Sequence, residues 1–323
     1  MTSRLIGFVL AVLLAASASA AERRALKVGL LKFGTVAWEL ETIRHHGLDR
    51  RHDIAVSPVE FATNDAAKVA LQAGAVDLIV TDWPWVARQR AEGADFSFIP
   101  YSKAVGTLLV RPASEIADLA GLKGKRIGVA GGPLDKSWIL LRALARRELG
   151  VDLADAAEPV FGAPPLLAEE FARGRLDAVL TYWHYAARLE TAGAKPLFTV
   201  AEIIRRLGVA ADVPMLGYAF REDWAARESE TMRAFVAASR EAKSILGRSS
   251  EEWGRLAPQI GTAEPATLAA MQSGYRAGIP EKWGEAERRA AADLHAILVE
   301  IGGERLMGRA RSLEGTFWPE VSY

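Results

Sequence analysis

Short apolar runs alternate with amphipathic stretches along the chain, a pattern typical of strands followed by helices. The clearest run is residues 77–80, an aspartate followed by three consecutive apolar residues, and it predicts a buried strand. Thr-Asp-Trp-Pro-Trp follows directly at residues 81–85. In an open parallel sheet, ligands bind beyond the carboxyl ends of the strands. We therefore expect Asp82, Trp83 and Trp85 to form one wall of a small-molecule pocket.

The same reasoning predicts alternating elements over the first two thirds of the chain and mainly helices after it. Strands are expected at residues 26–31, 54–61, 77–80, 96–101, 106–111, within 122–130, and at 160–162, 176–180 and 213–220. Helices are expected at residues 36–46, 66–73, 85–92, 137–149 and 164–173, and then at 223–226, 230–246, 250–260, 264–272 and 285–301. Such alternation predicts an α/β fold, with the C-terminal helices packed around it.

Residues 70–83 and 171–183 repeat one pattern. Each segment reads as a helix, a turn with glycine, an aspartate, an apolar strand and then Thr-x-Trp. This pattern indicates an internal duplication of a βαβ unit. It places Asp82-Trp83 and Tyr182-Trp183 at equivalent strand ends of two similar lobes, so we expect a cleft between them.

Residues 1–20 have the pattern of a secretory signal peptide. Arg4 provides the positive start, an apolar core follows, and Ala18-Ser19-Ala20 places the cleavage site near Ala20/Ala21. The apolar core is too short for the alternative, a membrane anchor. We expect an exported periplasmic protein with no direct membrane insertion.

The composition is that of a folded globular protein without a strong field. Apolar residues make up 50% and charged residues 25%, with 40 basic and 40 acidic side chains, so no nucleic-acid partner is implied. The chain has no cysteine, which excludes disulfides, thiolate metal sites and cysteine nucleophiles. We find no P-loop, no Gly-x-Gly-x-x-Gly and no nucleophile–base pair, and we therefore expect neither a cofactor nor an enzyme.

Four further segments carry a combined pattern. They are the opening strand with Gly34-Thr35, the Ala-x-x-Ala-Leu-x-Ala-Gly-x-x-Asp stretch at 67–77, the Leu-Lys-Gly-Lys-containing stretch at 116–129, and Gly-Arg-Leu-Asp-Ala at 174–178. In this order, and after a signal peptide, they make the chain resemble the periplasmic substrate-binding proteins of ABC importers. The nearest group is that of nitrate, sulfonate and taurine binders, with the thiamine-pyrimidine binders as relatives.

The resemblance implies a type II clamshell with two lobes and two crossover strands, at 108–111 and 216–220. Lobe one would comprise residues 26–110 and 216–323, and lobe two residues 111–215. A small-molecule ligand would bind between the lobes and be buried by hinge closure. The closed form, a monomer, would then dock on an ABC permease with its ATPase.

Mapping by position predicts the residues that contact the ligand. They are Thr35, Trp38, Asn64, Asp65, Asp82, Trp83, Trp85, Tyr101, Asp135, Trp138, Tyr182, Trp183, His184 and Tyr218. The loops among them contain several aromatic rings and three carboxylates but no arginine. Aromatic faces suit flat rings or cations, and carboxylates bind amines through charge-assisted hydrogen bonds. We therefore favour a heteroaromatic or amine-bearing ligand.

Several alternatives stay open at this point. Backbone N–H groups at the helix starts would suit a sulfonate or nitrate oxyanion. Asp65, Asp82, Asp135 and Glu39 offer oxygens for a hard metal ion. His45, His46 and His52 have the composition of a metal cluster, but they fall at a helix end and a turn. The tryptophans could belong to the core, and Asp65 and Asp135 could be helix caps. The protein could also be a periplasmic sensor that presents its ligand to a membrane receptor.

Overall fold

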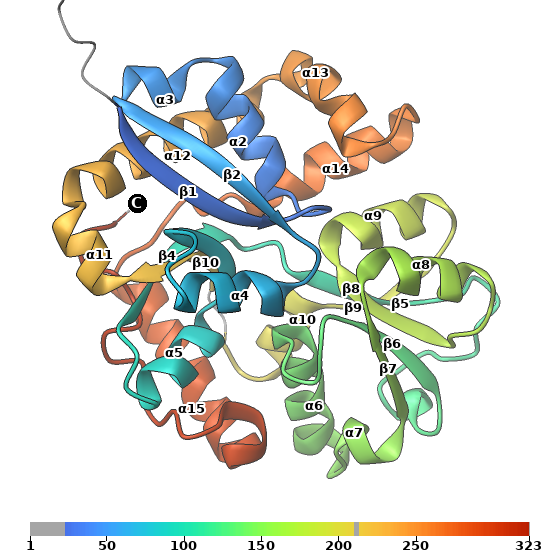
Figure 1. Cartoon of the computed structure of the whole chain (residues 1–323). Helices are drawn as coiled ribbons and strands as arrows, with labels where there is room; N and C mark the ends of the chain where they lie inside the picture. The colour runs from blue at the N-terminus through green and yellow to red at the C-terminus, as the bar shows by residue number, and fades with distance from the viewer. Residues whose placement is uncertain (1–22, 210–212, 323) are drawn as a thin grey trace, which may run out of the picture.

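The computed structural model describes residues 23–209 and 213–322, so the expected signal peptide lies outside the described residues. Within this part, the strands form two five-stranded sheets surrounded by helices (Figure 1). The first sheet has the order β2 (Ile54–Phe61), β1 (Arg24–Leu31), β3 (Leu78–Asp82), β10 (Leu216–Arg221) and β4 (Phe96–Ser102). The second has the order β7 (Glu158–Gly162), β6 (Arg126–Ala130), β8 (Ala178–Tyr182), β5 (Gly106–Val110) and β9 (Lys195–Thr199).

In each sheet, one strand directly follows a crossing of the chain from the other sheet. β10 runs antiparallel to β3 and β4 in the first sheet, and β5 runs antiparallel to β8 and β9 in the second. The chain therefore crosses between the sheets at residues 103–105 and again before β10. Because β5 is hydrogen-bonded entirely within the second sheet, we propose that lobe one ends at Ser102 and not at residue 110.

The strands β5 and β10 each have one position at which the neighbouring strand is too close for a side chain. A Cβ atom on Gly217 would lie 2.3 Å from the carbonyl oxygen of Ile99, and one on Gly106 would lie 2.3 Å from that of Thr181. Any larger residue would push the neighbouring strand away, so glycine is required where the chain passes from lobe to lobe.

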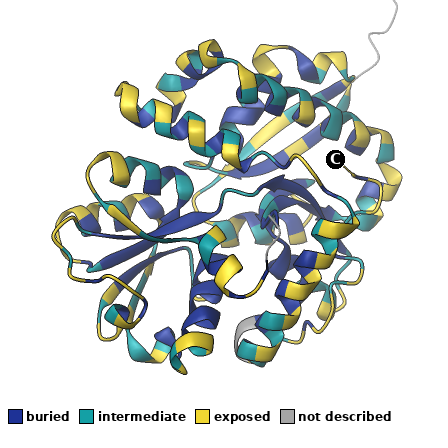
Figure 2. Cartoon of the chain, turned by 180° about the vertical axis from the view of Figure 1, so that it is seen from behind, coloured by how far each residue is buried: buried dark blue, intermediate teal, exposed yellow. Residues whose placement is uncertain are grey.

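Helices cover both faces of the sheets. In the first half of the chain they are α2 (Val36–His45), α3 (Leu48–Arg51), α4 (Asn64–Gln72), α5 (Trp83–Ala91), the short 3₁₀ helix at Ala120–Leu122, α6 (Lys136–Leu149) and α7 (Leu153–Ala156). Further along are α8 (Pro164–Ala172), α9 (Trp183–Thr191), α10 (Val200–Arg206), α11 (Glu222–Arg227), α12 (Ser229–Arg248), α13 (Ser250–Ile260), α14 (Pro265–Gly278) and α15 (Glu285–Met307). Buried residues concentrate in the strands, whereas exposed ones lie on the outer turns (Figure 2).

The C-terminal helices contact both lobes. Helix α14 packs against α9, and α15 packs against α6 as well as α5. Arg146 of α6 donates a hydrogen bond from Nη1 to the carbonyl oxygen of Ile301 in α15 at 3.0 Å. The predicted extra helices are confirmed, but they join the lobes as well as covering the first one. None of the described helices is apolar over a length that would cross a bilayer.

The predicted duplication has a structural counterpart in two aspartates. Asp77 accepts a hydrogen bond from the backbone N–H of Lys27 at 2.7 Å, and Asp177 accepts one from that of Arg126 at 2.9 Å. Each aspartate thus precedes one central strand and binds the backbone of the neighbouring strand, β1 or β6. The elements β9 and α10 were not anticipated, because residues 195–199 contain only a short, interrupted apolar run.

Candidate functional site

A cleft between the lobes consists of two adjoining cavities of about 790 and 80 Å³. The loops after β1, β2 and β3 line it from the first lobe, and those after β6, β7 and β8 from the second. Leu31, Asn64, Asp82 and Tyr182 line both cavities. The carboxyl ends of the parallel strands of both sheets therefore meet at this cleft, the usual ligand position in open α/β sheets.

Most of the predicted ligand-contacting residues line the cleft. They are Thr35, Asn64, Asp65, Asp82, Trp85, Tyr101, Asp135, Tyr182, Trp183 and His184. Asp65 is at the rim, where its side chain is 87% exposed and pairs with Lys68 at 3.4 Å. The others come from loops that are far apart in the sequence and are brought together by the duplicated topology.

Four predicted site residues line neither cavity: Trp38, Trp83, Trp138 and Tyr218. Trp83 is fully buried, with its ring centroid 6.2 Å from His295 and 6.3 Å from Phe317.

The other three are buried in the core as well. Trp138 is fully buried in α6, and the Trp38 ring packs edge-on against Trp253. Tyr218 donates a hydrogen bond to the buried carboxylate of Glu39 at 2.8 Å. An indole or phenol suits a core as well as a ligand pocket, so the sequence could not separate the two roles.

Asp82 and Tyr182 occupy the equivalent strand ends that the duplication predicts. The Asp82 carboxylate caps α5 by accepting a hydrogen bond from the N–H of Trp85 at 2.9 Å. The Tyr182 hydroxyl accepts one from Asn64 Nδ2 at 2.9 Å, which joins the two lobes across the cleft. Burial, followed by the charge of Asp135, raises the pKa of Tyr182. The phenol is therefore neutral at physiological pH.

Asp135 places a second buried carboxylate on the opposite wall. It caps α6 through a hydrogen bond from the N–H of Ser137 at 2.9 Å, and it pairs with Lys136 at 3.4 Å. The Lys136 ammonium also lies 4.9 Å from the centroid of the Tyr182 ring. Asp135 is thus both the cap of α6 and a residue that lines the cleft.

Arg88 is one of the cleft residues that the sequence did not predict. It lies in the middle of α5, is 8% exposed and lines the larger cavity. The expectation of a cleft without arginine considers only the loops, and Arg88 lies within a helix. One face of α5, together with its two ends, carries at helical spacing four residues that all line this cavity: Asp82, Trp85, Arg88 and Glu92. That spacing was the available signal.

His184 forms a second contact between the lobes. Its Nε2 atom lies 3.0 Å from the carbonyl oxygen of Phe33. Since a carbonyl only accepts, Nε2 carries the hydrogen. Burial is the main cause that lowers the pKa of His184 to about 4, partly opposed by this hydrogen bond. The imidazole is therefore neutral at pH 7.

This shift predicts that acid weakens the fold. Below about pH 6.5 His184 becomes protonated in the unfolded chain, whereas in the folded protein it stays neutral down to about pH 4. The free energy of unfolding should fall from this group alone by about 2 kcal/mol between pH 7 and pH 5. In urea unfolding at both pH values, His184→Gln, which keeps a donor for Phe33, should lose that much less stability than the wild type.

The exposed His45→Gln variant is the matched control and should follow the wild type, because other titrating groups are common to all three proteins. Equal pH dependence of wild type and His184→Gln would contradict the assignment of this group.

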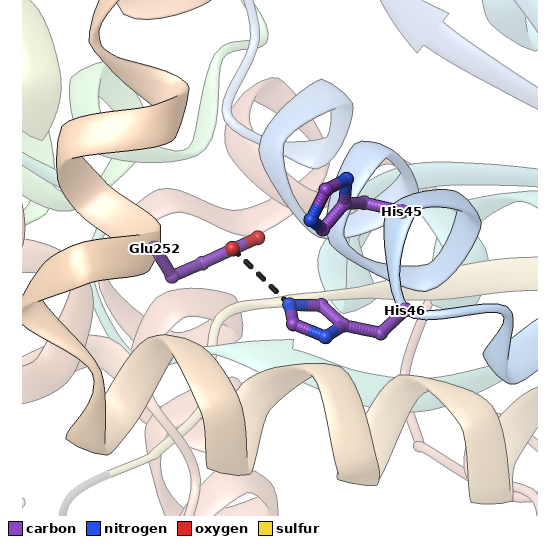
Figure 3. Close-up of side chains that lie close together, drawn as sticks. All are labelled: His45, His46 and Glu252. Atoms are coloured by element: carbon purple, nitrogen blue, oxygen red, sulfur yellow. Dashed lines mark hydrogen bonds and ion pairs between the residues drawn. The ribbon is translucent and has the colours of Figure 1, made fainter.

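The metal alternatives are not favoured by the geometry. His45 and His46 do approach Glu252, and His46 contacts it at 3.2 Å (Figure 3). However, both oxygens of Glu252 already accept hydrogen bonds from Arg255, at 2.7 and 3.0 Å, and a guanidinium repels a metal ion there. His52 is elsewhere, paired with Glu241.

Glu39, named as an oxygen ligand for a hard cation, is a core residue. Its carboxylate is fully buried and pairs with Lys243. It is therefore absent from the cleft lining that Asp65, Asp82 and Asp135 share.

With this geometry in view, the chain can be compared with known proteins. The family model described as NMT1/THI5 like matches residues 44–247, and the chain belongs to that family. No curated protein sequence matches the chain.

Solved structures confirm the fold. The alkanesulfonate-binding protein SsuA from Xanthomonas axonopodis pv. citri, bound to MOPS, is 21% identical, with a TM-score of 0.74 over 92% of this chain and 99% of that one. SsuA from Escherichia coli, a periplasmic aliphatic sulphonate-binding protein, is 21% identical, with a TM-score of 0.72 over 93% and 94%. A zinc-bound ligand-binding component of an ABC-type import system from Staphylococcus aureus is 12% identical, with a TM-score of 0.70 over 92% and 97%. The predicted type II periplasmic-binding-protein fold is thus confirmed.

Proposed function

We propose that the protein is the periplasmic solute-binding component of an ABC importer. It captures an amine-bearing or heteroaromatic small molecule between its lobes and delivers it to a membrane permease, with binding and release but no chemistry. The likeness to two sulfonate-binding proteins and to a ligand-binding component of an ABC-type import system supports this role. Lobe closure around a solute is the motion that such folds use.

The observation that carries the ligand class is the pair of buried carboxylates on opposite walls. Asp82 is 6% exposed and Asp135 is 9% exposed, and the Tyr182 ring is on the same cleft. Charged acceptors taken out of water bind N–H donors strongly. The aromatic ring adds a face for a cation or a flat ring.

Asp82→Asn is the first test of this assignment. Asparagine keeps an oxygen for the N–H of Trp85 and removes only the charge, so folding should be preserved. A hydrogen bond to a charged group contributes about 1.5–3 kcal/mol, and affinity for an amine should therefore fall about 10- to 100-fold. Calorimetry with benzylamine and 4-aminopyrimidine measures the change.

Asp65→Asn is the control, because that carboxylate is exposed at the rim. The measurements use refolded protein, so that no co-purified solute remains. Unchanged amine affinity in Asp82→Asn would contradict the role of this carboxylate.

A second candidate is an oxyanion held in the smaller cavity. Helices α2 and α9 start there, one from each lobe, without a side-chain cap, and their free backbone N–H groups attract anions. The likeness to sulfonate-binding proteins supports this alternative. A rise in melting temperature with methanesulfonate but with none of the amines would favour it.

A further inference from the structure

Among the described residues, the Arg88 guanidinium has no hydrogen-bond or ion-pair partner, and the carboxylates of Asp82, Glu92 and Asp135 act on it only at longer range. The Nη1 atom is inaccessible and has no hydrogen-bond partner, and Arg88 forms no hydrogen bond or ion pair with any residue that the structure describes. Its aliphatic stem lies against Gly308, just beyond α15. Arg88 is also one of the residues that line the 790 Å³ cavity.

Comparable buried cations in this protein are paired. Arg142 forms two hydrogen bonds of 2.7 Å with Asp152, Lys243 pairs with Glu39, and Lys136 pairs with Asp135 at 3.4 Å. Burying a charge without a partner destabilises a fold by several kcal/mol. A site that keeps such a charge on a cleft wall is suited to an anionic group of a ligand.

Asp82 is the complementary charge on the same helix. The Oδ1 atom of Asp82 caps α5. Among the described residues, no cation lies within ion-pair distance of the Asp82 carboxylate. Asp82 and Arg88 are six residues apart, about 9 Å along the helix axis, and they do not pair with each other. Trp85 lies between them on the same cleft-facing stripe. The wall thus offers a buried anion and a buried cation separated by an aromatic surface.

We propose that the ligand is a zwitterion whose ammonium group binds Asp82 and whose carboxylate or sulfonate binds Arg88. This inference rests on the proposed function, since it assumes a solute in the cleft. A ligand with both charges neutralises Asp82 and Arg88 at once. A ligand with one charge leaves the other buried group unpaired, and sites of this kind reject such analogues strongly.

Matched probes test the two ends separately. Calorimetry on refolded protein would compare 3-aminopropanoate, 5-aminopentanoate and 3-aminopropanesulfonate with propylamine, pentylamine, propanoate, pentanoate and propanesulfonate. We expect at least one zwitterion to bind at least 100-fold more tightly than its amine and acid analogues. Binding of no zwitterion, or of an analogue as tightly as the zwitterion, would overturn the inference.

Arg88→Met supplies an independent readout. Methionine removes the charge and keeps an apolar stem, so affinity for the zwitterion should fall to that of the matched amine. At the same time the unfolding midpoint without ligand should stay equal or rise, which loss of a structural arginine would not produce. Arg173→Met, on the exposed surface of α8's end, should change neither quantity. Unchanged zwitterion affinity in Arg88→Met would also overturn the inference.

The outcomes separate this inference from the proposed function. If amines bind and Asp82→Asn weakens them, but an added acid group gives no gain, only the zwitterion assignment fails. If methanesulfonate binds while amines and zwitterions do not, both fail.

Discussion

Lys243→Met is expected to lower the free energy of unfolding by about 3–5 kcal/mol, the usual loss when one partner of a buried ion pair is removed. Lys243 of α12 donates to the Oε2 atom of Glu39, which is fully buried in α2. Tyr218 and Ser239 donate to the other oxygen at 2.8 and 2.6 Å, and Tyr275 donates to Oε2 at 3.0 Å. Without the ammonium, this buried carboxylate would be left with hydroxyl donors alone.

Urea unfolding at pH 7 measures the loss, and two variants control it. The double variant Lys243→Met, Glu39→Gln removes both charges and should recover most of the stability. Lys123→Met changes an exposed lysine and should alter stability by no more than about 0.5 kcal/mol. A loss of that small size in Lys243→Met itself would show that the pair does not stabilise the fold.

The second large effect is expected for Trp83→Ala, with a loss of about 3–5 kcal/mol. Trp83 is completely buried at the start of α5, so its removal leaves a cavity that the surrounding helices cannot fill. Since Trp83 lines neither cavity of the cleft, the remaining folded protein should bind ligand as the wild type does. Unfolding curves and calorimetry on the folded fraction test both statements.

Tyr182→Phe is the contrasting variant for a cleft aromatic. It removes only the hydroxyl that accepts from Asn64, and its stability should fall by about 1 kcal/mol. A large ligand-affinity loss in Trp83→Ala, with stability preserved, would return Trp83 to the site and contradict its placement in the core.

The architecture could be predicted because its signals are local and repeated. Apolar runs bounded by glycine turns mark most strands, and the match between residues 70–83 and 171–183 gives the two-lobe plan. The topology then places Asp82 and Tyr182 at equivalent strand ends. The positions of β5 and β10 in the sheets are harder to predict, because a strand's sequence does not reveal which sheet it joins.

The site itself was only partly predictable, because side-chain direction depends on packing. Trp83 and Trp85 are two residues apart on α5, so they point to different sides of the helix, and only Trp85 lines the cleft. Glu39 and Tyr218 are far apart in sequence but form a hydrogen bond in the core, where Lys243 of α12 also contacts Glu39. Arg88 was overlooked since it lies within a helix and not in a loop.

Helix α15 connects the two lobes in addition to the two segments that cross between the sheets, because it contacts α5 in one lobe and α6 in the other. Separation of the lobes must therefore break or slide one of these helix contacts, including the hydrogen bond from Arg146 to Ile301. The end of this helix also lines the larger cavity, through Glu304 and the following Gly308. The time for which a solute remains captured then depends on these helix contacts at the edge of the cleft as well as on the contacts made by the solute.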